Sequence, residues 1–287
     1  MPDSFRGTPD RGPNVARRRL LVVAAGGVAI GIGTVVGRGG ARPVSAAENG
    51  AAREATPTAS PSATRAAAAR KAPAQPRPST GQEGSGPAKA PAAGQPMYYL
   101  DDGPKVIALT IDDGPSPAYT PQVLQVLEKY GVLATFSMVG KNVSYYPGVA
   151  KDVAQAGHTI INHTWDHANL TPLSGSLVRD EISKASDAIE AAAGVRPTMF
   201  RAPYGAWSAA ALDCCASARL TPLDWSVDPR DWSRPGVSAI VSNILRNTGT
   251  GSIILEHDGG GNRSQTVAAL KIVIPRLLDE GYRFEVP

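Results

Sequence analysis

The sequence predicts an α/β fold, a distorted (β/α) barrel of about seven strands, and three observations lead to this prediction. Short runs of apolar and β-branched residues recur in the second part of the chain, and segments of helical character separate them. This alternation is typical of a largely parallel sheet. Polar residues cluster directly after several runs, as expected where strand ends converge on the mouth of a barrel. The predicted strands span residues 106–111, 134–139, 158–162, 198–201, 220–227, 252–256 and 282–286.

Helices are predicted between these strands. Thr120 supplies an N-cap and Pro121 a first-turn proline for one helix, which Gly131 ends. A second helix is predicted from about residue 176 to 194 and a third from 265 to 280, with Pro275 interrupting the third.

The first part of the chain has a different composition, so we expect three segments in all. Residues 1–46 are predicted to be an export signal or N-terminal anchor, because tandem arginines precede an apolar run at 20–37 and a cleavage pattern at 44–46. A twin-arginine route, a Sec route and a retained membrane tether all fit this segment. Residues 47–96 lack Val, Ile, Leu, Met and aromatic residues, which predicts a disordered Ala/Pro-rich linker. Residues 97–287 form the folded domain, placed outside the cell or in its envelope.

The charge of the folded part excludes one class of partner. Residues 97–287 carry 16 Lys and Arg against 20 Asp and Glu, so there is no basic surface for a nucleic acid. The two cysteines, Cys214 and Cys215, are neighbours in the chain, where disulfide geometry is rare. We expect both to be small buried side chains in or beside a helix.

Polar clusters follow five of the predicted strands. Because the C-terminal ends of the strands converge, we expect these side chains to meet at one mouth of the barrel. The clusters contain Asp112 and Asp113, His163 and His167, Arg201 and Tyr204, Asp231 and Trp232, and Leu255 and His257.

The spacing of His163 and His167 predicts a metal site. Residues four apart on one helical turn share a face, and two imidazoles with one carboxylate make an open three-ligand site for zinc or another divalent metal. Of Asp112 and Asp113, one should bind the metal and the other should act as general base, because consecutive strand residues point in different directions. A simple Asx-type turn is the structural alternative for the pair. His158 lies inside an apolar run and is assigned to the core.

Together these stretches resemble the five motifs of the polysaccharide deacetylases of carbohydrate esterase family 4, the domain shared with the chitooligosaccharide deacetylase of nodulation. The resemblance covers residues 105–286. It implies a barrel of the polysaccharide deacetylase type and one divalent metal ion, with Zn²⁺ expected. Carried over to the matching positions, it makes Asp112 the base and assigns the metal ligands to Asp113, His163 and His167.

The resemblance also implies roles for the later motifs. His257 would be the acid that protonates the leaving group, with Asp231 as its charge partner, although Asp224 and Asp228 lie close enough in sequence to be alternatives. Arg201 would orient the base carboxylate, and the backbone N–H of Tyr204 would help to hold the oxyanion. The acetyl pocket would be lined by Tyr204, Trp232 and Leu255. The sequence departs from the family at Leu133, where a basic residue is frequent.

The function implied is that of a metal-dependent hydrolase acting on linear amide C–N bonds. It would remove acetyl groups from N-acetylglucosamine units of a cell-wall or chitin-like polysaccharide, either peptidoglycan or chitooligosaccharide. An O-acetyl xylan esterase on the same fold and a non-catalytic glycan-binding relative are the alternatives.

Overall fold

The structure, a computed structural model, describes residues 94–287. The predicted export signal and all but the last residues of the predicted linker lie outside the described residues. The strands are β1 (Val106–Gly114), β2 (Thr135–Met138), β3 (Thr159–Asn162), β4 (Met199–Phe200), β5 (Thr221–Pro222), β6 (Ile253–His257) and β7 (Arg283–Phe284). All seven lie within the predicted runs or extend them by a few residues.

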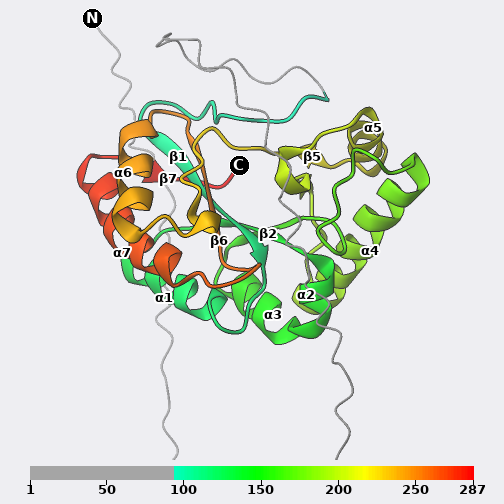
Figure 1. Ribbon diagram of the computed structural model, residues 1–287, viewed down its shortest axis with the longest axis horizontal. Coiled ribbons are helices and arrows are strands. Elements are labelled where there is room, and N and C mark those ends of the chain that lie inside the picture. Colours follow the sequence, from blue (N-terminus) through cyan, green and yellow to red (C-terminus); the bar gives the residue numbers. More distant parts are fainter. Residues whose placement is uncertain (1–93) are drawn as a thin grey trace, which may run out of the picture. The chain divides into compact units, whose positions relative to one another are not determined.

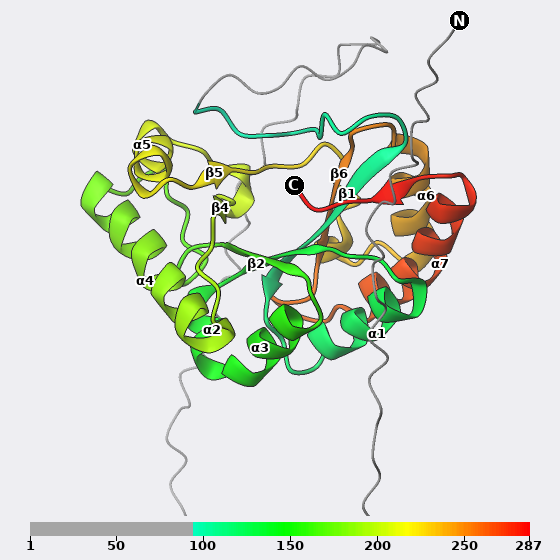
Figure 2. The same ribbon diagram turned by 180° about the vertical axis from the view of Figure 1, so that it is seen from behind.

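The helices are α1 (Thr120–Tyr130), α2 (Gly140–Tyr145), α3 (Pro147–Gln155), α4 (Gly175–Ala193), α5 (Ala209–Ala218), α6 (Val237–Asn247) and α7 (Ser264–Asp279). Two short 3-10 turns, η1 (Pro203–Gly205) and η2 (Asp231–Ser233), follow β4 and β5. Figures 1 and 2 show the helices arranged around the outside of the sheet. No helix of residues 94–287 combines the length and apolarity needed to cross a bilayer.

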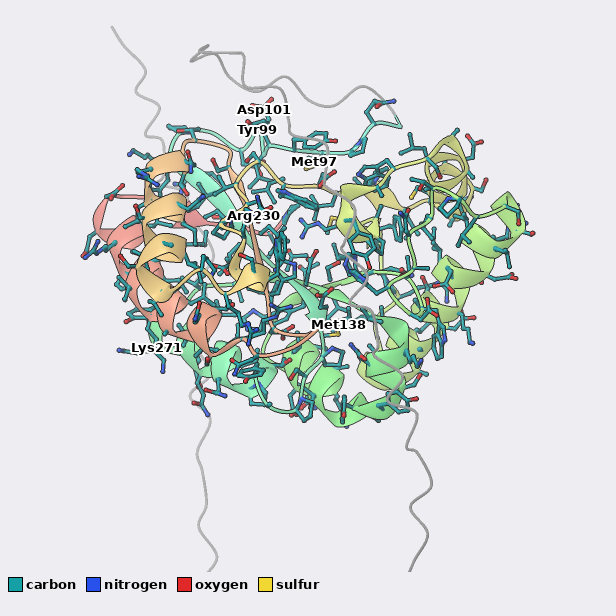
Figure 3. The ribbon with its side chains drawn as sticks, viewed as in Figure 1. Met97, Tyr99, Asp101, Met138, Arg230 and Lys271 are labelled. Carbon is teal, nitrogen blue, oxygen red and sulfur yellow. The ribbon has the colours of Figure 1, made fainter. Side chains whose placement is uncertain are left out.

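The sheet is parallel and curls into an open barrel. Its strand order is β5-β4-β3-β2-β1-β6, and β7 pairs with the first residues of β1. The segment before β1, which carries Met97 and Tyr99 (Figure 3), spans the open side. Met97 donates its N–H to the carbonyl of Pro222 in β5 at 2.9 Å, and Leu100 donates to Gly251 ahead of β6 at 2.8 Å. The distorted barrel predicted from the sequence is confirmed. In a closed barrel β5 and β6 would pair directly, whereas here the segment before β1 lies between them.

The alternation of side chains along β1 separates two parts of the core. Ile107, Leu109 and Ile111 belong to the apolar cluster between the sheet and the outer helices, whereas Val106 and Ala108 belong to the cluster inside the barrel. Residues two apart on a strand point to the same face. The inner face therefore continues through Thr110 to Asp112, so the strand itself delivers a carboxylate to the mouth of the barrel.

Two helix predictions need correction. Tyr119, not Thr120, is the N-cap of α1, and the Thr120 hydroxyl instead donates to the buried carboxylate of Asp258. Helix α7 continues through Pro275. The proline removes the helical donor of the Lys271 carbonyl, and the hydroxyl of Tyr130 on α1 replaces it at 3.3 Å.

The predictions for the cysteines and for His158 are confirmed. Cys214 and Cys215 are free thiols buried in α5. His158 is buried, packs against the ring of Phe136 and accepts the N–H of Ala134 at 3.3 Å.

Candidate active site

The paired aspartates lie at a break in the regular register of β1. Asp112 pairs with Ser137 of β2 and Gly114 pairs with Met138, so Asp113 is the extra residue of a bulge, and its φ is 71°. The sequence-based prediction assumed a regular strand, which would point the two carboxylates to opposite faces. The bulge instead brings Asp112 Oδ2 and Asp113 Oδ1 each to 3.6 Å from His163 Nε2.

The segment from His163 to His167 is not helical, which corrects the predicted helical turn. Thr164 and His167 have positive φ values of 66° and 63°, and the backbone makes a compact loop after β3. Asn162 Oδ1 accepts the N–H of Thr164 at 2.8 Å, and Glu181 of α4 accepts the N–H of Trp165 at 3.0 Å. The loop still places the two imidazole rings 5.0 Å apart, so the predicted pairing of the histidines is reached by a different backbone path.

Asp113, His163 and His167 form a set of donors suited to a metal ion. One ligand atom from each lies within 4.8 Å of the others, and His167 Nε2 is 3.1 Å from Asp113 Oδ1. Asp113 Oδ1 is buried and has no hydrogen-bond partner in the described part of the chain. A buried, unpartnered carboxylate oxygen facing two imidazole nitrogens is costly without a cation. Two nitrogens and one oxygen suit zinc and leave a coordination position open.

Asp112 is held by a buried arginine. Arg201 has no exposed surface, and its Nη1 donates to Asp112 Oδ1 at 2.7 Å and to the Thr110 hydroxyl at 2.8 Å. Its Nη2 donates to the backbone carbonyl of Asp224 at 2.9 Å. One oxygen of Asp112 is therefore fixed by a charged donor, while the other faces His163.

His257 and Asp231 form a second fixed pair. Strand β6 lies beside β1 with His257 in register with Asp112. Asp231 Oδ1 is 2.7 Å from His257 Nδ1, and its Oδ2 accepts the backbone N–H of His257 at 3.0 Å and the Thr266 hydroxyl at 2.6 Å. The other two aspartates are engaged elsewhere, because Asp224 accepts from Trp207 Nε1 and Asp228 accepts from the N–H of Arg230.

The surroundings separate the charge states of the two imidazoles. Burial lowers the pKa of His163 to about 4 and outweighs the attraction of Asp112 and Asp113, so this ring is neutral, as a metal ligand must be. Burial also acts to lower the pKa of His257, but the Asp231 carboxylate outweighs it and raises that pKa to about 9. His257 is thus protonated at neutral pH and can act as a proton donor.

The three residues predicted to line an acetyl pocket lie on the elements around these pairs. Tyr204 is on η1 and is 46% exposed, with its hydroxyl 3.1 Å from His167 Nδ1. Trp232 is on η2, under the guanidinium of Arg230, and Leu255 is buried two residues before His257. Their contact with an acetyl group stays a prediction.

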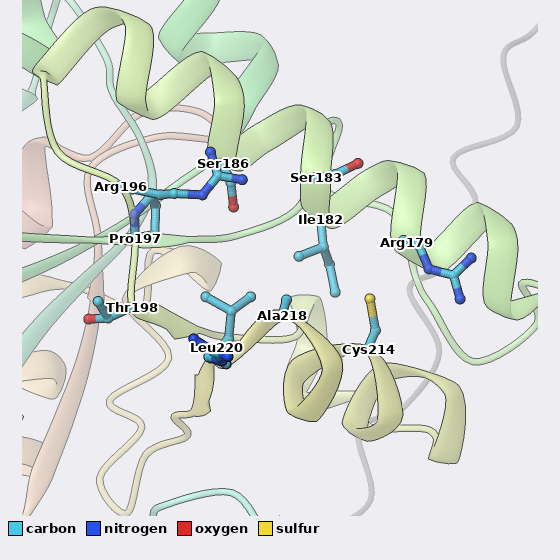
Figure 4. A pocket seen from close by; sticks show the side chains of 11 residues that line it. Arg179, Ile182, Ser183, Ser186, Arg196, Pro197, Thr198, Cys214, Ala218 and Leu220 are labelled. Carbon is cyan, nitrogen blue, oxygen red and sulfur yellow. The ribbon is translucent and has the colours of Figure 1, made fainter.

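A hollow elsewhere in the domain does not coincide with this cluster. It measures about 280 Å³ and lies between α4 and α5, where Ile182 and Cys214 line it (Figure 4). None of the predicted site residues lines it. The polar cluster, not this hollow, therefore marks the candidate active site.

Several supporting residues carried no signal in the sequence. Thr266, Glu181 and Thr110 are common residue types at unremarkable positions, yet each holds a site group or its loop. Arg263 is buried with its Nη2 3.8 Å from Asp113 Oδ2, and its Nε donates to the Gly259 carbonyl at 2.5 Å. Only the folded arrangement gives these residues their role, because their partners are far away in the chain.

Comparison with known proteins gives the same family as the motifs. Residues 100–223 match the family model described as polysaccharide deacetylase. The chain is 42% identical to a chitooligosaccharide deacetylase of Azorhizobium caulinodans, over 62% of this chain and 91% of the relative. It is 40% identical to a peptidoglycan-N-acetylglucosamine deacetylase of Bacillus cereus, over 67% of this chain and 90% of the relative.

A solved structure extends the likeness to the fold. A carbohydrate esterase family 4 pseudoenzyme from Bacillus anthracis matches with a TM-score of 0.64 and 29% identity, over 67% of each chain. The identity to the two deacetylases extends over about nine tenths of their length. The chain therefore belongs to the polysaccharide deacetylase family, the carbohydrate deacetylases of carbohydrate esterase family 4.

Proposed function

We propose that this deacetylase is a metal-dependent hydrolase that removes acetyl groups from N-acetylglucosamine units of peptidoglycan or of a chitin-like oligosaccharide. The observation that carries the proposal is that a metal-ligand set, a carboxylate held by Arg201 and an imidazole held by Asp231 meet at one edge of the sheet. The names of the relatives support the choice of an N-acetylated glycan as substrate.

Asp113, His163 and His167 would hold the metal ion, with Zn²⁺ expected from the donor set. When bound, the ion would polarise the acetyl carbonyl and lower the pKa of a water molecule. The proton transfers of the reaction would be carried out by side chains of the protein. An amide is a poor electrophile with a poor leaving group, so its hydrolysis needs a base for the attacking water and an acid for the departing amine.

Asp112 would accept the proton of the attacking water on Oδ2, because Arg201 already occupies Oδ1. The backbone N–H of Tyr204 would donate to the oxyanion that develops on the carbonyl oxygen. As the C–N bond breaks, His257 would give its Nε2 proton to the amine nitrogen, leaving acetate and a free amino sugar. Asp231 keeps His257 charged and oriented for this transfer.

Acetate release decides between this proposal and its alternatives. The purified chain, loaded with Zn²⁺, should release acetate from N-acetyl-chitooligosaccharides and from peptidoglycan faster than from acetylated xylan. Faster release from xylan would make the protein an O-acetyl esterase. No release from any of the three, with metal bound in stoichiometric amount, would identify a non-catalytic glycan-binding relative.

We also propose that residues 1–46 direct export and that residues 47–96 connect this signal to the catalytic domain of residues 97–287, giving an extracellular or envelope-associated enzyme. The composition of both segments supports this arrangement. N-terminal sequencing of the protein from culture medium and from membranes would test it. A mature chain that begins near residue 47 indicates cleavage, an intact chain in the membrane fraction indicates an anchor, and an intact chain inside the cell refutes export.

A further inference from the structure

The two histidines of the ligand set are held in different ways. His163 Nδ1 is 2.8 Å from the backbone carbonyl of Arg201. A carbonyl only accepts, so Nδ1 carries the proton, and the Nε2 lone pair always faces Asp113 and Asp112. His163 is buried, and its tautomer is therefore set by the backbone before any metal arrives.

His167 has no such fixed partner. Its Nδ1 faces the hydroxyl of Tyr204 at 3.1 Å, and its Nε2 faces Asp113 Oδ1 at 3.1 Å. A tyrosine hydroxyl can donate or accept. Without metal, either ring nitrogen can carry the proton, because Nδ1 can accept from the Tyr204 hydroxyl or donate to it. With metal at Nε2, the proton must lie on Nδ1 and needs an acceptor there.

The position of Tyr204 is built into the fold. Its φ is 64°, in the left-handed region that non-glycine residues rarely occupy at a cost of about 1–2 kcal/mol. The turn is closed by Gly205 and Ala206, which donate to the carbonyls of Ala202 and Pro203 at 3.1 Å each. The Tyr204 ring meets the His167 ring edge to face, with centroids 4.6 Å apart. The hydroxyl is thus held against Nδ1 by a strained turn and by ring packing together.

We propose that the Tyr204 hydroxyl is a positioning group for the metal site: it accepts a hydrogen bond from the Nδ1–H of His167 and so keeps the Nε2 lone pair free to bind the ion. This inference rests on the proposed metal-dependent function and assigns the side chain of Tyr204 a role separate from that of its backbone N–H. Partners that fix the tautomer of a ligating histidine typically change metal affinity by about 10–100-fold. Because Tyr204 is half exposed and water can replace part of the bond, the lower end applies.

The test compares zinc affinity in three versions of the full chain: wild type, Tyr204→Phe and Tyr145→Phe. The phenylalanine at 204 keeps the ring and its packing and removes only the hydroxyl. Tyr145 is 65% exposed, is not one of the ligand residues and packs its ring against Tyr146, so its variant serves as the control. Each protein is stripped of metal and titrated with Zn²⁺ against a chromophoric chelator, and the melting temperature of the metal-free form is recorded in parallel.

We expect the zinc dissociation constant to rise about tenfold in Tyr204→Phe, to stay within twofold in Tyr145→Phe, and the metal-free melting temperatures to agree. In the zinc-loaded wild type, two-bond proton–nitrogen spectra of ¹⁵N-histidine should show His167 protonated at Nδ1. A Tyr204→Phe constant within twofold of wild type overturns the inference and leaves the metal site standing. A wild-type chain that binds no zinc overturns the proposed metal dependence itself.

Discussion

Replacing Asp231 by Asn tests whether its charge keeps His257 ready to donate a proton. Asn has nearly the same shape as Asp and can still accept a hydrogen bond, so the variant removes mainly the negative charge. Asp231 accepts from three donors, His257 Nδ1, the His257 backbone N–H and the Thr266 hydroxyl. An amide cannot accept from all three in the same way, so we also expect a loss of stability of about 1–2 kcal/mol.

The size of the effect on His257 follows from its surroundings. Burial acts to lower the pKa of this ring, but Asp231 and, to a smaller extent, Asp113 and Asp112 raise it to about 9. Without the Asp231 charge, burial and the two remaining carboxylates act in opposite directions, so the pKa should return to near the ordinary value of about 6.5, a change worth about 3 kcal/mol. At pH 8 the fraction of His257 that is protonated should therefore fall from about nine tenths in the wild type to about 3% in Asp231→Asn. A metal ion near Asp112 and Asp113 would lower both values, so the shift between the two proteins is the quantity to measure.

The assay is the pH profile of kcat/KM for acetate release between pH 5 and 10. The alkaline limb reports loss of the acid's proton, and in Asp231→Asn it should move to lower pH by about two units. Activity at pH 8 should fall by a further factor of about 30 beyond any loss seen at pH 6. Asp228→Asn is the matched control, since Asp228 lies on the same loop but bonds the N–H of Arg230. An alkaline limb that stays in place in Asp231→Asn, with metal content unchanged, would refute the role of Asp231.

The other predictions concern the base, the metal and a buried acid. Asp112→Asn should keep its metal, measured by elemental analysis, and lose turnover by about 10²–10⁴-fold. Because buried Arg201 loses its counter-ion, this variant should also lose about 3 kcal/mol in denaturant unfolding, and wild-type turnover would exclude Asp112 as the base. His163→Ala should retain less than about a tenth of the metal and no activity, whereas full metal content would exclude His163 as a ligand. Burial and the nearby Asp231 charge raise the pKa of Glu256 well above its usual value, so the folded state holds this proton more tightly than the unfolded chain does. The wild type should therefore lose stability relative to Glu256→Gln as the pH rises above the usual range of a glutamic acid, by up to about 1.4 kcal/mol per pH unit, and a pH-independent difference would contradict this.

Much of the fold follows from local patterns. The apolar run before Asp112 and the helical face between Thr120 and Gly131 are local features, and both elements form where they were predicted. The details that failed depend on distant partners. Pro275 does not interrupt α7, because Tyr130, far back in the chain, supplies the donor that the proline removes. Thr120 does not cap α1, because its hydroxyl is used by Asp258.

In the candidate site, too, some features could be predicted from local sequence and others depend on distant contacts. The order of the polar clusters after the strands predicted which side chains would gather, because the ends of parallel strands meet at one edge whatever the loops between them do. The backbone that brings them together was not predictable: a bulge at Asp113 and a non-helical loop at His163 replace the regular geometry assumed from the sequence. Bulges and left-handed residues are stabilised by contacts from other elements, so they leave little local signal.

By itself the sequence determined the alternation of strands and helices, the family and the side chains that we propose for the chemistry, since these depend on residue type and spacing along the chain. Only the tertiary structure decided which oxygen of Asp112 is free, which aspartate partners His257 and what holds each imidazole. Those choices depend on distances of about 3 Å between residues far apart in sequence, where hydrogen bonds and burial set both charge and orientation.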